Sequence, residues 1–171
     1  TSGGLLYGGR IESNPFGSLA ALRPDEFRLQ IGGGAIMDDG PTVNTMAWSV
    51  DGHLEFAGFR LRTEYLFDTR TPDAVPQIAS TLEGEVKRNA ELAEITGFLY
   101  RDLIEVVTRL ERYDNNQSYE DYGDQQIITG GLNLYLNGHR LKALLHYMHR
   151  DERQGAELDN DSVVLSVVGA M

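Results

Sequence analysis

Residues 126–150 read QIITGGLNLYLNGHRLKALLHYMHR, and this stretch decides the fold class because it predicts a single β-hairpin. Its centre is Asn137-Gly138, the dipeptide most typical of a two-residue type I′ turn, in which both residues adopt positive φ. With this turn, the apolar residues of the two strands share one face and the polar residues share the other. The predicted apolar pairs are Leu134–Leu141, Leu132–Ala143, Gly130–Leu145 and Ile128–Tyr147. The predicted polar pairs are Tyr135–Arg140, Asn133–Lys142 and Thr129–His146.

Two further segments give the same pattern. A turn at Ala57-Gly58 predicts the pairs Leu54–Leu61, Val50–Tyr65, Trp48–Phe67, Glu55–Arg60 and His53–Arg62. A turn at Arg101-Asp102 predicts the pairs Leu99–Ile104, Gly97–Val106, Ile95–Thr108, Ala93–Leu110 and Glu94–Arg109. Opposite charges that face each other across strands are favourable. Three hairpins with one apolar face each predict an all-β, antiparallel chain.

The composition restricts the classes of protein. A chain of 171 residues is expected to form a single domain, and the absence of cysteine excludes disulfide scaffolds and thiolate metal sites. The net charge of −11 argues against nucleic-acid binding, which needs clustered Lys and Arg. No apolar run approaches the roughly 18 residues of a membrane helix, whereas the strands of a membrane barrel are only half apolar.

The chain alternates between long strands and two kinds of connection. Nine strands are predicted, at about 5–13, 27–37, 45–56, 59–68, 90–100, 103–113, 126–136, 139–150 and 162–171. Lengths near ten residues suit a tilted strand that crosses a bilayer. Tight turns alternate with long polar segments at 69–89, 114–125 and 151–161, as in outer-membrane barrels. The connection 15–26 departs from this alternation because it is long where a tight turn is expected. It is expected to contain a short helical turn.

Two interpretations remain open on this pattern: a transmembrane barrel with the apolar face outside, and a soluble barrel that binds a small ligand in its interior. The polar face carries Arg, Glu, Asn and Thr rather than many lysines, which favours the membrane barrel. Aromatic residues near strand ends also suit the girdles of a membrane barrel, namely Trp48, Phe56, Phe59, Phe67, Tyr100, Tyr113 and Tyr147. A third interpretation is a structural part of a larger envelope assembly.

Three stretches resemble the phosphate-selective porin O and P family: ERYDNN (111–116) with the 125–152 hairpin, LEFAGFRLRTEYLF (54–67) and YGGRIESNPFG (7–17). The resemblance covers most of the chain, and the hairpin is its most specific part. It implies a trimeric, sixteen-stranded outer-membrane porin, a passive diffusion channel for small solutes or ions, including anions such as phosphate. The chain would then be the C-terminal part of such a barrel, with about seven further strands before it. Its end, Gly169-Ala170-Met171, differs from the aromatic residue on which such barrels usually finish.

We expect the polar face to line a pore. The candidate pore-lining residues are Arg60, Arg62, Glu64, Glu94, Glu105, Arg109, Glu111, Asn133, Tyr135, Arg140, Lys142 and His146. Charges in a pore wall bias ion traffic, so the basic residues among them would favour anions locally. The alternative is that the Arg–Glu pairs only brace the wall. The expected partners are membrane lipid and lipopolysaccharide.

No enzymatic chemistry and no cofactor are expected. His146 and His149 are spaced three apart, and positions i and i+3 of a strand point to opposite faces, so a shared metal is not expected. Gly32-Gly33-Gly34 lies inside a strand and lacks the spacing of a nucleotide-binding loop. The acidic segment 114–124 lacks the spacing of a calcium-binding loop, and we expect it to be a solvated loop.

Overall fold

The protein folds into a single antiparallel β-sheet. The computed structural model describes residues 4–19, 23–40, 43–72, 84–118, 123–136, 140–152 and 160–169. The strands are β1 (Leu5–Ser13), β2 (Arg28–Asp39), β3 (Val43–Phe56), β4 (Phe59–Pro72), β5 (Val86–Tyr100), β6 (Ile104–Asp114), β7 (Gln125–Tyr135), β8 (Leu141–Glu152) and β9 (Ser162–Gly169). The predicted all-β fold and the existence of all nine strands are confirmed. Within the described ranges, no helix is long and apolar enough to cross a membrane.

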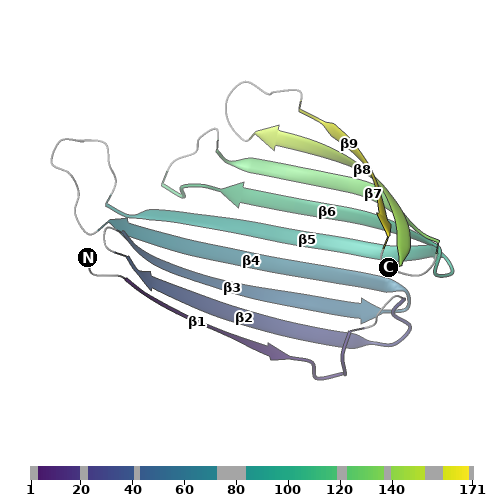
Figure 1. Ribbon diagram of the computed structural model, residues 1–171, viewed down its shortest axis with the longest axis horizontal. Helices are drawn as coiled ribbons and strands as arrows, with labels where there is room; N and C mark the ends of the chain where they lie inside the picture. Colours follow the sequence, from purple (N-terminus) through teal and green to yellow (C-terminus); the bar gives the residue numbers. More distant parts are fainter. Residues whose placement is uncertain are drawn as a thin grey trace.

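The strands follow one another in the sheet in the order of the sequence, from β1 to β9. Every neighbouring pair is antiparallel, and β1 and β9 form the two edges of the sheet. Figure 1 shows that the sheet twists and curls, so that β7, β8 and β9 stand at an angle to the broad surface formed by β1 to β5. The nine strands therefore form an open, curved sheet and not a closed barrel.

The connections differ at the two ends of the strands. The tight turns after β3 and β5 lie at one end, where β7 also ends and β8 begins, and the chain segments that link β4 to β5, β6 to β7 and β8 to β9 leave from the other end (Figure 1). These connections follow the predicted alternation of short and long connections, whereas the long β1–β2 connection lies at the turn end and the short β2–β3 connection lies at the other end. Most of the predicted long segments, at 73–83, 119–122 and 153–159, lie outside the described residues.

The β3–β4 hairpin has the predicted turn and register. Ala57 and Gly58 have φ values of 50° and 87°, as both central residues of a type I′ turn require. Leu54 pairs with Leu61, Glu55 with Arg60 and His53 with Arg62.

The β5–β6 hairpin matches the prediction except beside its turn. Gly97 pairs with Val106 and Glu94 with Arg109, as predicted, but Ile104 pairs with Tyr100 because the register shifts between Phe98 and Tyr100. The predicted Leu99–Ile104 pair is therefore wrong. Leu103 N donates to Tyr100 O at 3.0 Å, which closes a four-residue turn in which Arg101 has a φ of 46°.

The β7–β8 hairpin is shifted by two residues from the prediction. Leu134 pairs with Ala143, Leu132 with Leu145 and Tyr135 with Lys142. Leu136 N donates to Leu141 O at 2.9 Å, so the connection has four residues instead of two. The predicted pairs Leu134–Leu141 and Tyr135–Arg140 are wrong, and Asn137-Gly138 itself lies outside the described residues. An even shift leaves every side chain on its predicted face.

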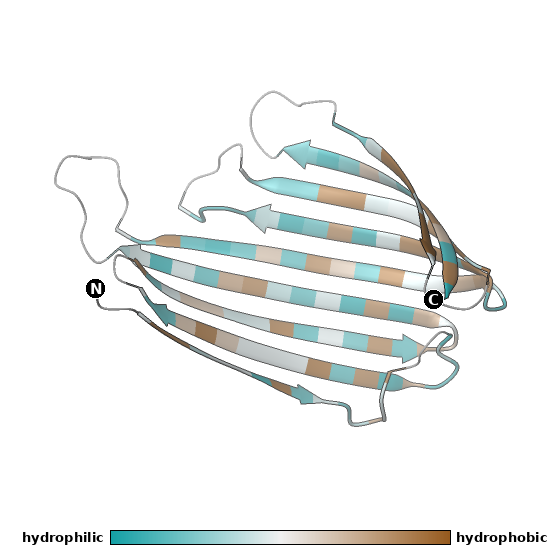
Figure 2. Ribbon diagram, viewed as in Figure 1, coloured by the Kyte–Doolittle hydropathy of each residue, from teal (hydrophilic) through white to brown (hydrophobic). Residues whose placement is uncertain are grey.

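The sheet has one apolar face and one polar face, and their exposure is the reverse of that in a soluble protein. Side chains of the apolar face are exposed, for example Leu132 at 47% and Leu165 at 73%. Side chains of the polar face include Glu55 at 1% and Glu105 at 3% exposure. Figure 2 shows the resulting alternation of hydrophilic and hydrophobic residues along the strands.

The β1–β2 connection folds across the turn end of the sheet. Gly58 N donates to Pro24 O at 2.5 Å, and Arg23 Nη1 donates to the carbonyl of Arg101 at 3.3 Å, so this connection contacts both neighbouring hairpin turns. Pro24 is fully buried there. Gly17 N donates to Asn14 O at 3.2 Å in a turn, and the described residues 15–19 and 23–26 contain no helical turn, whereas residues 20–22 of the predicted segment lie outside the described residues.

Candidate functional site

The register places eleven of the twelve candidate residues on the polar face. Arg62, Glu94 and Arg109 form one row across β4, β5 and β6, because each pairs with the next. The same alternation places the other residues on this face, which are Arg60, Glu64, Glu105, Glu111, Asn133, Tyr135, Lys142 and His146. Arg140 is the exception, because it precedes β8 and is exposed in the connection from β7.

A recess of about 590 Å³ lies on the polar face toward the turn end of the sheet. Seven of the candidate residues line it: Arg60, Arg62, Glu94, Glu105, Asn133, Tyr135 and His146. The lining also includes Leu19 of the β1–β2 connection. The sequence therefore identified about half of the lining through strand alternation alone.

Arg60 lies between two buried carboxylates. Its Nε donates to Glu55 Oε1 at 3.0 Å, and its Nη1 lies 3.8 Å from Glu105 Oε1. Glu55 and Glu105 are 1% and 3% exposed. A buried carboxylate is strongly destabilising without a cation or hydrogen-bond donors, so Arg60 makes the burial of this pair possible.

Glu105 is held by a chain of hydrogen bonds that continues to β8. Its Oε2 accepts from Asn133 Nδ2 at 2.8 Å and from the Tyr135 hydroxyl at 2.7 Å. Asn133 Oδ1 in turn lies 2.9 Å from His146 Nε2. The ring of Tyr135 lies 5.7 Å from that of Phe98, which fixes its position above β5. The chain joins β6, β7 and β8 on the polar face.

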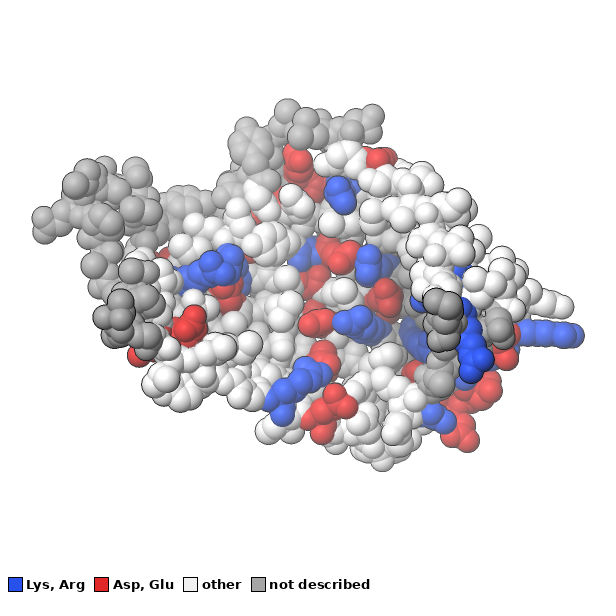
Figure 3. All heavy atoms as spheres, in the orientation of Figure 1, with Lys and Arg blue, Asp and Glu red and all other residues white. Residues whose placement is uncertain are grey.

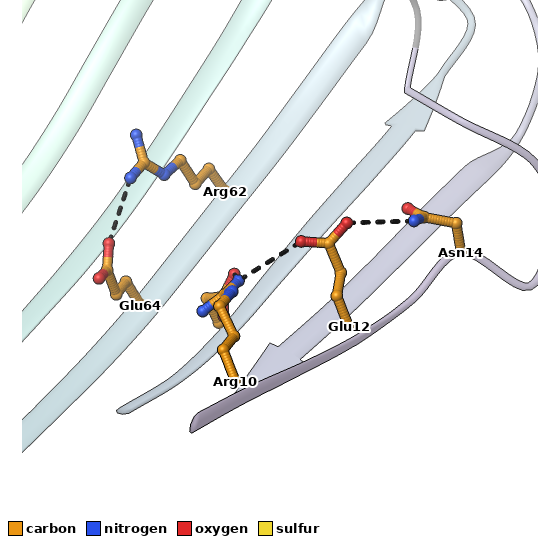
Figure 4. Close-up of polar contacts among 6 residues, drawn as sticks. Arg10, Glu12, Asn14, Arg62 and Glu64 are labelled. Carbon is orange, nitrogen blue, oxygen red and sulfur yellow. Dashed lines mark hydrogen bonds and ion pairs between the residues drawn. The ribbon is translucent and has the colours of Figure 1, made fainter. Parts of the chain in front are cut away.

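A second ion pair crosses β2. Arg10 Nη2 lies 2.6 Å from Asp51 Oδ1, although β2 separates their strands. Gly32 of β2 lies beneath the pair, and a Cβ there would be 2.6 Å from Asp51 Oδ2. The absence of a side chain at Gly32 is what allows this contact. Figure 4 shows that Arg10 also approaches Glu12, at 3.7 Å, and that Asn14 donates to Glu12 at 3.2 Å.

Further pairs continue across the centre of the sheet. Arg62 Nη2 donates to Glu64 Oε2 at 3.2 Å (Figure 4), and Arg109 Nε lies 3.1 Å from Glu111 Oε2. Glu94 is 3.9 Å from Arg109 Nη1. Figure 3 shows the result, with acidic and basic side chains interleaved over the middle of the sheet.

The loop end of the polar face has its own ion pair. Arg88 Nε donates to Asp68 Oδ1 at 2.7 Å, and Arg70 Nε donates to Asp68 Oδ2 at 3.2 Å. Arg70 and Arg88 lie beyond the predicted ends of β4 and β5, and Asp68 is the last residue of the predicted β4. Glu64 and Glu111 line a smaller hollow of about 220 Å³ that also lies away from the recess.

Three buried polar atoms of the recess have no hydrogen-bond partner among the described residues. They are Asp51 Oδ2, His53 Nε2 and Thr96 Oγ1. Thr96 as a whole is 9% exposed. A buried polar group without a partner is unfavourable, so these atoms are available to water or a ligand.

Several lining residues were absent from the predicted site, although the pattern contained a signal for most of them. Glu55 and His53 are the cross-strand partners of Arg60 and Arg62, so the predicted register alone would have placed them on the same face. Thr96 lies two residues from Glu94 on β5. Arg10 has no such signal, because its contact with Asp51 depends on Gly32, and Leu19 has none because it lies in the β1–β2 connection.

No group of three or more potential metal ligands occurs among the described residues. His149 and His146 occupy opposite faces of β8, as predicted, and His149 Nδ1 lies 2.8 Å from Asp161 Oδ1 on the far side from the recess. The Tyr147 hydroxyl donates to the other oxygen of Asp161. Hydrogen bonds from Tyr147 and His149 lower the pKa of the Asp161 carboxyl below its ordinary value.

Comparison of the chain with models of protein families, with curated proteins and with solved structures finds no match in any of the three.

Proposed function

We propose that the chain forms the C-terminal part of a bacterial outer-membrane porin, a passive diffusion channel for small solutes or ions that resembles the phosphate-selective porin O and P family. Its apolar face would contact lipid and lipopolysaccharide, and its polar face would line the water-filled lumen. As in that family, three copies would form a trimer. The channel performs no chemistry and needs no cofactor.

The observation that carries this proposal is the reversed burial of the two faces. Leu132, Leu145 and Leu165 are between 47% and 73% exposed, whereas Glu55, Glu105 and Asn133 are at most 7% exposed. In water, exposure of a whole apolar face is unfavourable, at about 25 cal/mol per Å² of apolar surface. In a bilayer the same face is surrounded by hydrocarbon, and the polar face is sheltered from it.

Three further features support a channel wall. The strands have between 8 and 15 residues, compared with about 9–11 that cross a bilayer when tilted. The β3–β4 and β5–β6 turns are tight at one end of the strands, and the longer β4–β5, β6–β7 and β8–β9 connections leave from the other end, as in outer-membrane barrels, although the long β1–β2 connection and the short β2–β3 connection depart from this pattern. The polar face carries charges of both signs, which suits contact with passing ions and water.

The soluble barrel with an internal ligand remains the alternative. It requires the apolar face to be enclosed, and in the described residues that face is the exposed one. Its behaviour in solution also differs, because a soluble barrel needs no detergent. Purification with and without detergent separates the two, and a monodisperse, folded protein in detergent-free buffer would favour the alternative.

The direct test of the proposal is conductance. We expect the complete barrel, which is this chain together with the roughly seven strands proposed to precede it, to produce stepwise increases in current when it is refolded in detergent and added to a planar lipid bilayer. Protein unfolded in urea and added at the same concentration is the control. The absence of steps from folded, membrane-inserted protein would refute the proposed channel.

The assignment of the two faces has its own test. Single cysteines are introduced at Leu61 on the apolar face and at Arg62 on the polar face, where the side chain is 52% exposed, and the chain itself has no cysteine. A membrane-impermeant thiol reagent should modify cysteine at 62 in vesicles and leave cysteine at 61 unmodified. The reverse result would exchange the lipid and lumen faces.

A further inference from the structure

The positive charges of the recess are already neutralised within the sheet. Each of its three arginines has a carboxylate oxygen close by: Arg10 pairs with Asp51 at 2.6 Å, Arg60 with Glu55 at 3.0 Å and Arg62 with Glu64 at 3.2 Å. An anion that entered the recess would have to compete with these carboxylates for the guanidinium groups. Charge-assisted hydrogen bonds are stronger than neutral ones, and the Arg60–Glu55 pair is also buried.

The negative charges are not neutralised to the same extent. The recess is lined by four carboxylates, from Asp51, Glu55, Glu94 and Glu105, and by three guanidinium groups. With neutral histidines, the lining therefore has a net charge of −1. Glu94 is 3.9 Å from Arg109, whose Nε lies closer to Glu111 at 3.1 Å. Asp51 Oδ2 has no hydrogen-bond partner among the described residues.

A buried hydroxyl supplies an independent sign of a ligand. Thr96 is 9% exposed, lines the recess, and its Oγ1 has no hydrogen-bond partner in the described part of the chain. Thr96 lies two residues after Glu94 on β5, so both side chains project from the same face of the strand. A polar ligand beside Glu94 would form a hydrogen bond with this hydroxyl and remove the free-energy cost of burying it without a partner.

The size of the recess restricts the ligand further. Sites for small organic molecules commonly have volumes between about 300 and 1,000 Å³. The recess, at about 590 Å³, falls in this range and is much larger than a bare ion requires. A compact organic molecule with a positive charge fits both the volume and the charge.

We propose that the recess binds small organic cations with a protonated amino group. Asp51 and Glu94 provide the counter-charge, and the Thr96 hydroxyl provides a hydrogen-bond partner. An ammonium group has three donors and no acceptor, so it requires acceptor oxygens such as Asp51 Oδ2 and Thr96 Oγ1, which have no hydrogen-bond partner among the described residues. The inference rests on the proposed function and specifies its solute class. It also reverses the anion preference expected from the positions of the arginines, because those arginines are paired.

Ligand binding tests the site without relying on conductance. Ethanolamine and inorganic phosphate are titrated separately into the refolded complete barrel in detergent, and binding is measured by calorimetry. We expect ethanolamine to bind and phosphate not to bind. Glu94→Gln should weaken ethanolamine binding by about tenfold or more, the loss expected for one charge-assisted hydrogen bond. Thr96→Val, which keeps the shape of the side chain, should weaken it by about threefold to tenfold.

Glu152→Gln is the matched control, because it removes the same charge at the loop end of β8, outside the recess lining. It should leave ethanolamine binding unchanged. Absence of ethanolamine binding by the wild type, binding of phosphate in its place, or equal affinities in all three variants would overturn the inference.

Conductance then separates the inference from the proposed function. In a potassium chloride gradient across a planar bilayer, the reversal potential should indicate a preference for K⁺ that Glu94→Gln reduces, and ethanolamine should reduce the current. Channels that prefer Cl⁻ would contradict the inference and leave the proposed channel intact. Ethanolamine binding without any channels would support the recess as a site and refute the channel.

Discussion

At the scale of single residues, glycine determines which side chains can lie across a strand. Gly32 leaves room for the Arg10–Asp51 pair, and Gly131 leaves room for the ring of His146. On the apolar face, Gly97 lies beneath the ring of Phe59, whose Cδ1 would be 2.7 Å from an added Cβ. Each contact joins strands across a glycine, where the side chain of any other residue would overlap the contacting groups.

Gly131 provides the sharpest test of this effect. In Gly131→Ala, the new Cβ would lie 2.8 Å from the backbone oxygen of Leu145 and would also overlap the ring of His146. Because a backbone atom cannot move aside easily, we expect a loss of about 1–3 kcal/mol in the free energy of unfolding. Urea unfolding in detergent, followed by the fluorescence of the single tryptophan Trp48, measures it.

Gly130→Ala is the matched control. Gly130 is the adjacent residue on the opposite face, and no heavy atom lies within 4 Å of a Cβ built there. Alanine should be neutral or slightly stabilising at this position, because it reduces the entropy of the unfolded chain. Equal losses in the two variants would show that the contact over Gly131 is unimportant.

Ala57 is a residue whose backbone conformation disfavours its own side chain. It has a φ of 50°, in the left-handed region that glycine and asparagine adopt more readily. We expect Ala57→Gly to stabilise the β3–β4 hairpin by up to about 1 kcal/mol. The reverse exchange at Gly58, where φ is 87°, should destabilise the protein. The two midpoints of urea unfolding should therefore move in opposite directions, and a fall in both would contradict this account of the turn.

At the scale of elements, the hairpins explain what sequence patterns can and cannot predict. The β3–β4 register was predicted correctly because Ala57-Gly58 occupies the two-residue turn. The β7–β8 register was predicted two residues away from its true position, because Asn137-Gly138 favours a two-residue turn and alternation is unchanged by an even shift. The face of the sheet on which a side chain lies is therefore predicted more securely than the residue with which it pairs across the strands.

The ends of β4 and β5 were also not predicted by the apolar alternation. β4 continues to Pro72 and β5 begins at Val86, several residues beyond the apolar alternation that was used to predict them. Polar residues hold these ends together, through the Asp68–Arg88 ion pair. Hydrophobicity alone contains no signal for strands extended in this way.

The β7–β8 register can be verified by cross-linking. Cysteines at Leu132 and Leu145 are directly opposite each other in the sheet, whereas Leu132 and Ala143 would be opposite in the two-residue hairpin. With a short thiol cross-linker, the pair at 132 and 145 should react faster and in higher yield, because directly opposite Cβ atoms are about 4.5–5.5 Å apart and diagonal positions about 7–8 Å. Preferential cross-linking of 132 with 143 would support the two-residue turn. Mass spectrometry of the digested protein identifies the linked residues.

At the scale of the whole molecule, alternation predicted the polar face but not the recess. Arg60, Glu94 and Asn133 were recognisable from their positions in the strands. The recess itself arises from the curvature of the sheet and from the β1–β2 connection, whose Leu19 lines it. The contacts of that connection with two hairpin turns join residues far apart in the sequence, and the hairpin patterns contained no signal for them.

The proposed lipid face yields a prediction about the whole fold. Leu134→Arg should lower the free energy of unfolding by about 2–4 kcal/mol in lipid vesicles if residue 134 lies near the middle of the bilayer. Arginine at that position would contact hydrocarbon. The same substitution should lower the free energy of unfolding much less in detergent micelles, because detergent molecules rearrange around a charge. Equal effects in vesicles and micelles would argue against contact with lipid.

The odd number of strands has a consequence for how the sheet can be completed. In an up-and-down sheet of nine strands, the first and the last run in the same direction. Each edge exposes unpaired backbone groups, which favour pairing with another strand. A ring that remains antiparallel throughout therefore needs an odd number of additional strands between β9 and β1, since an even number would create one parallel seam. Two copies joined edge to edge with their apolar faces on the same side can remain antiparallel only where like strands meet, β1 with β1 or β9 with β9, which is a testable rule for any assembly of this chain.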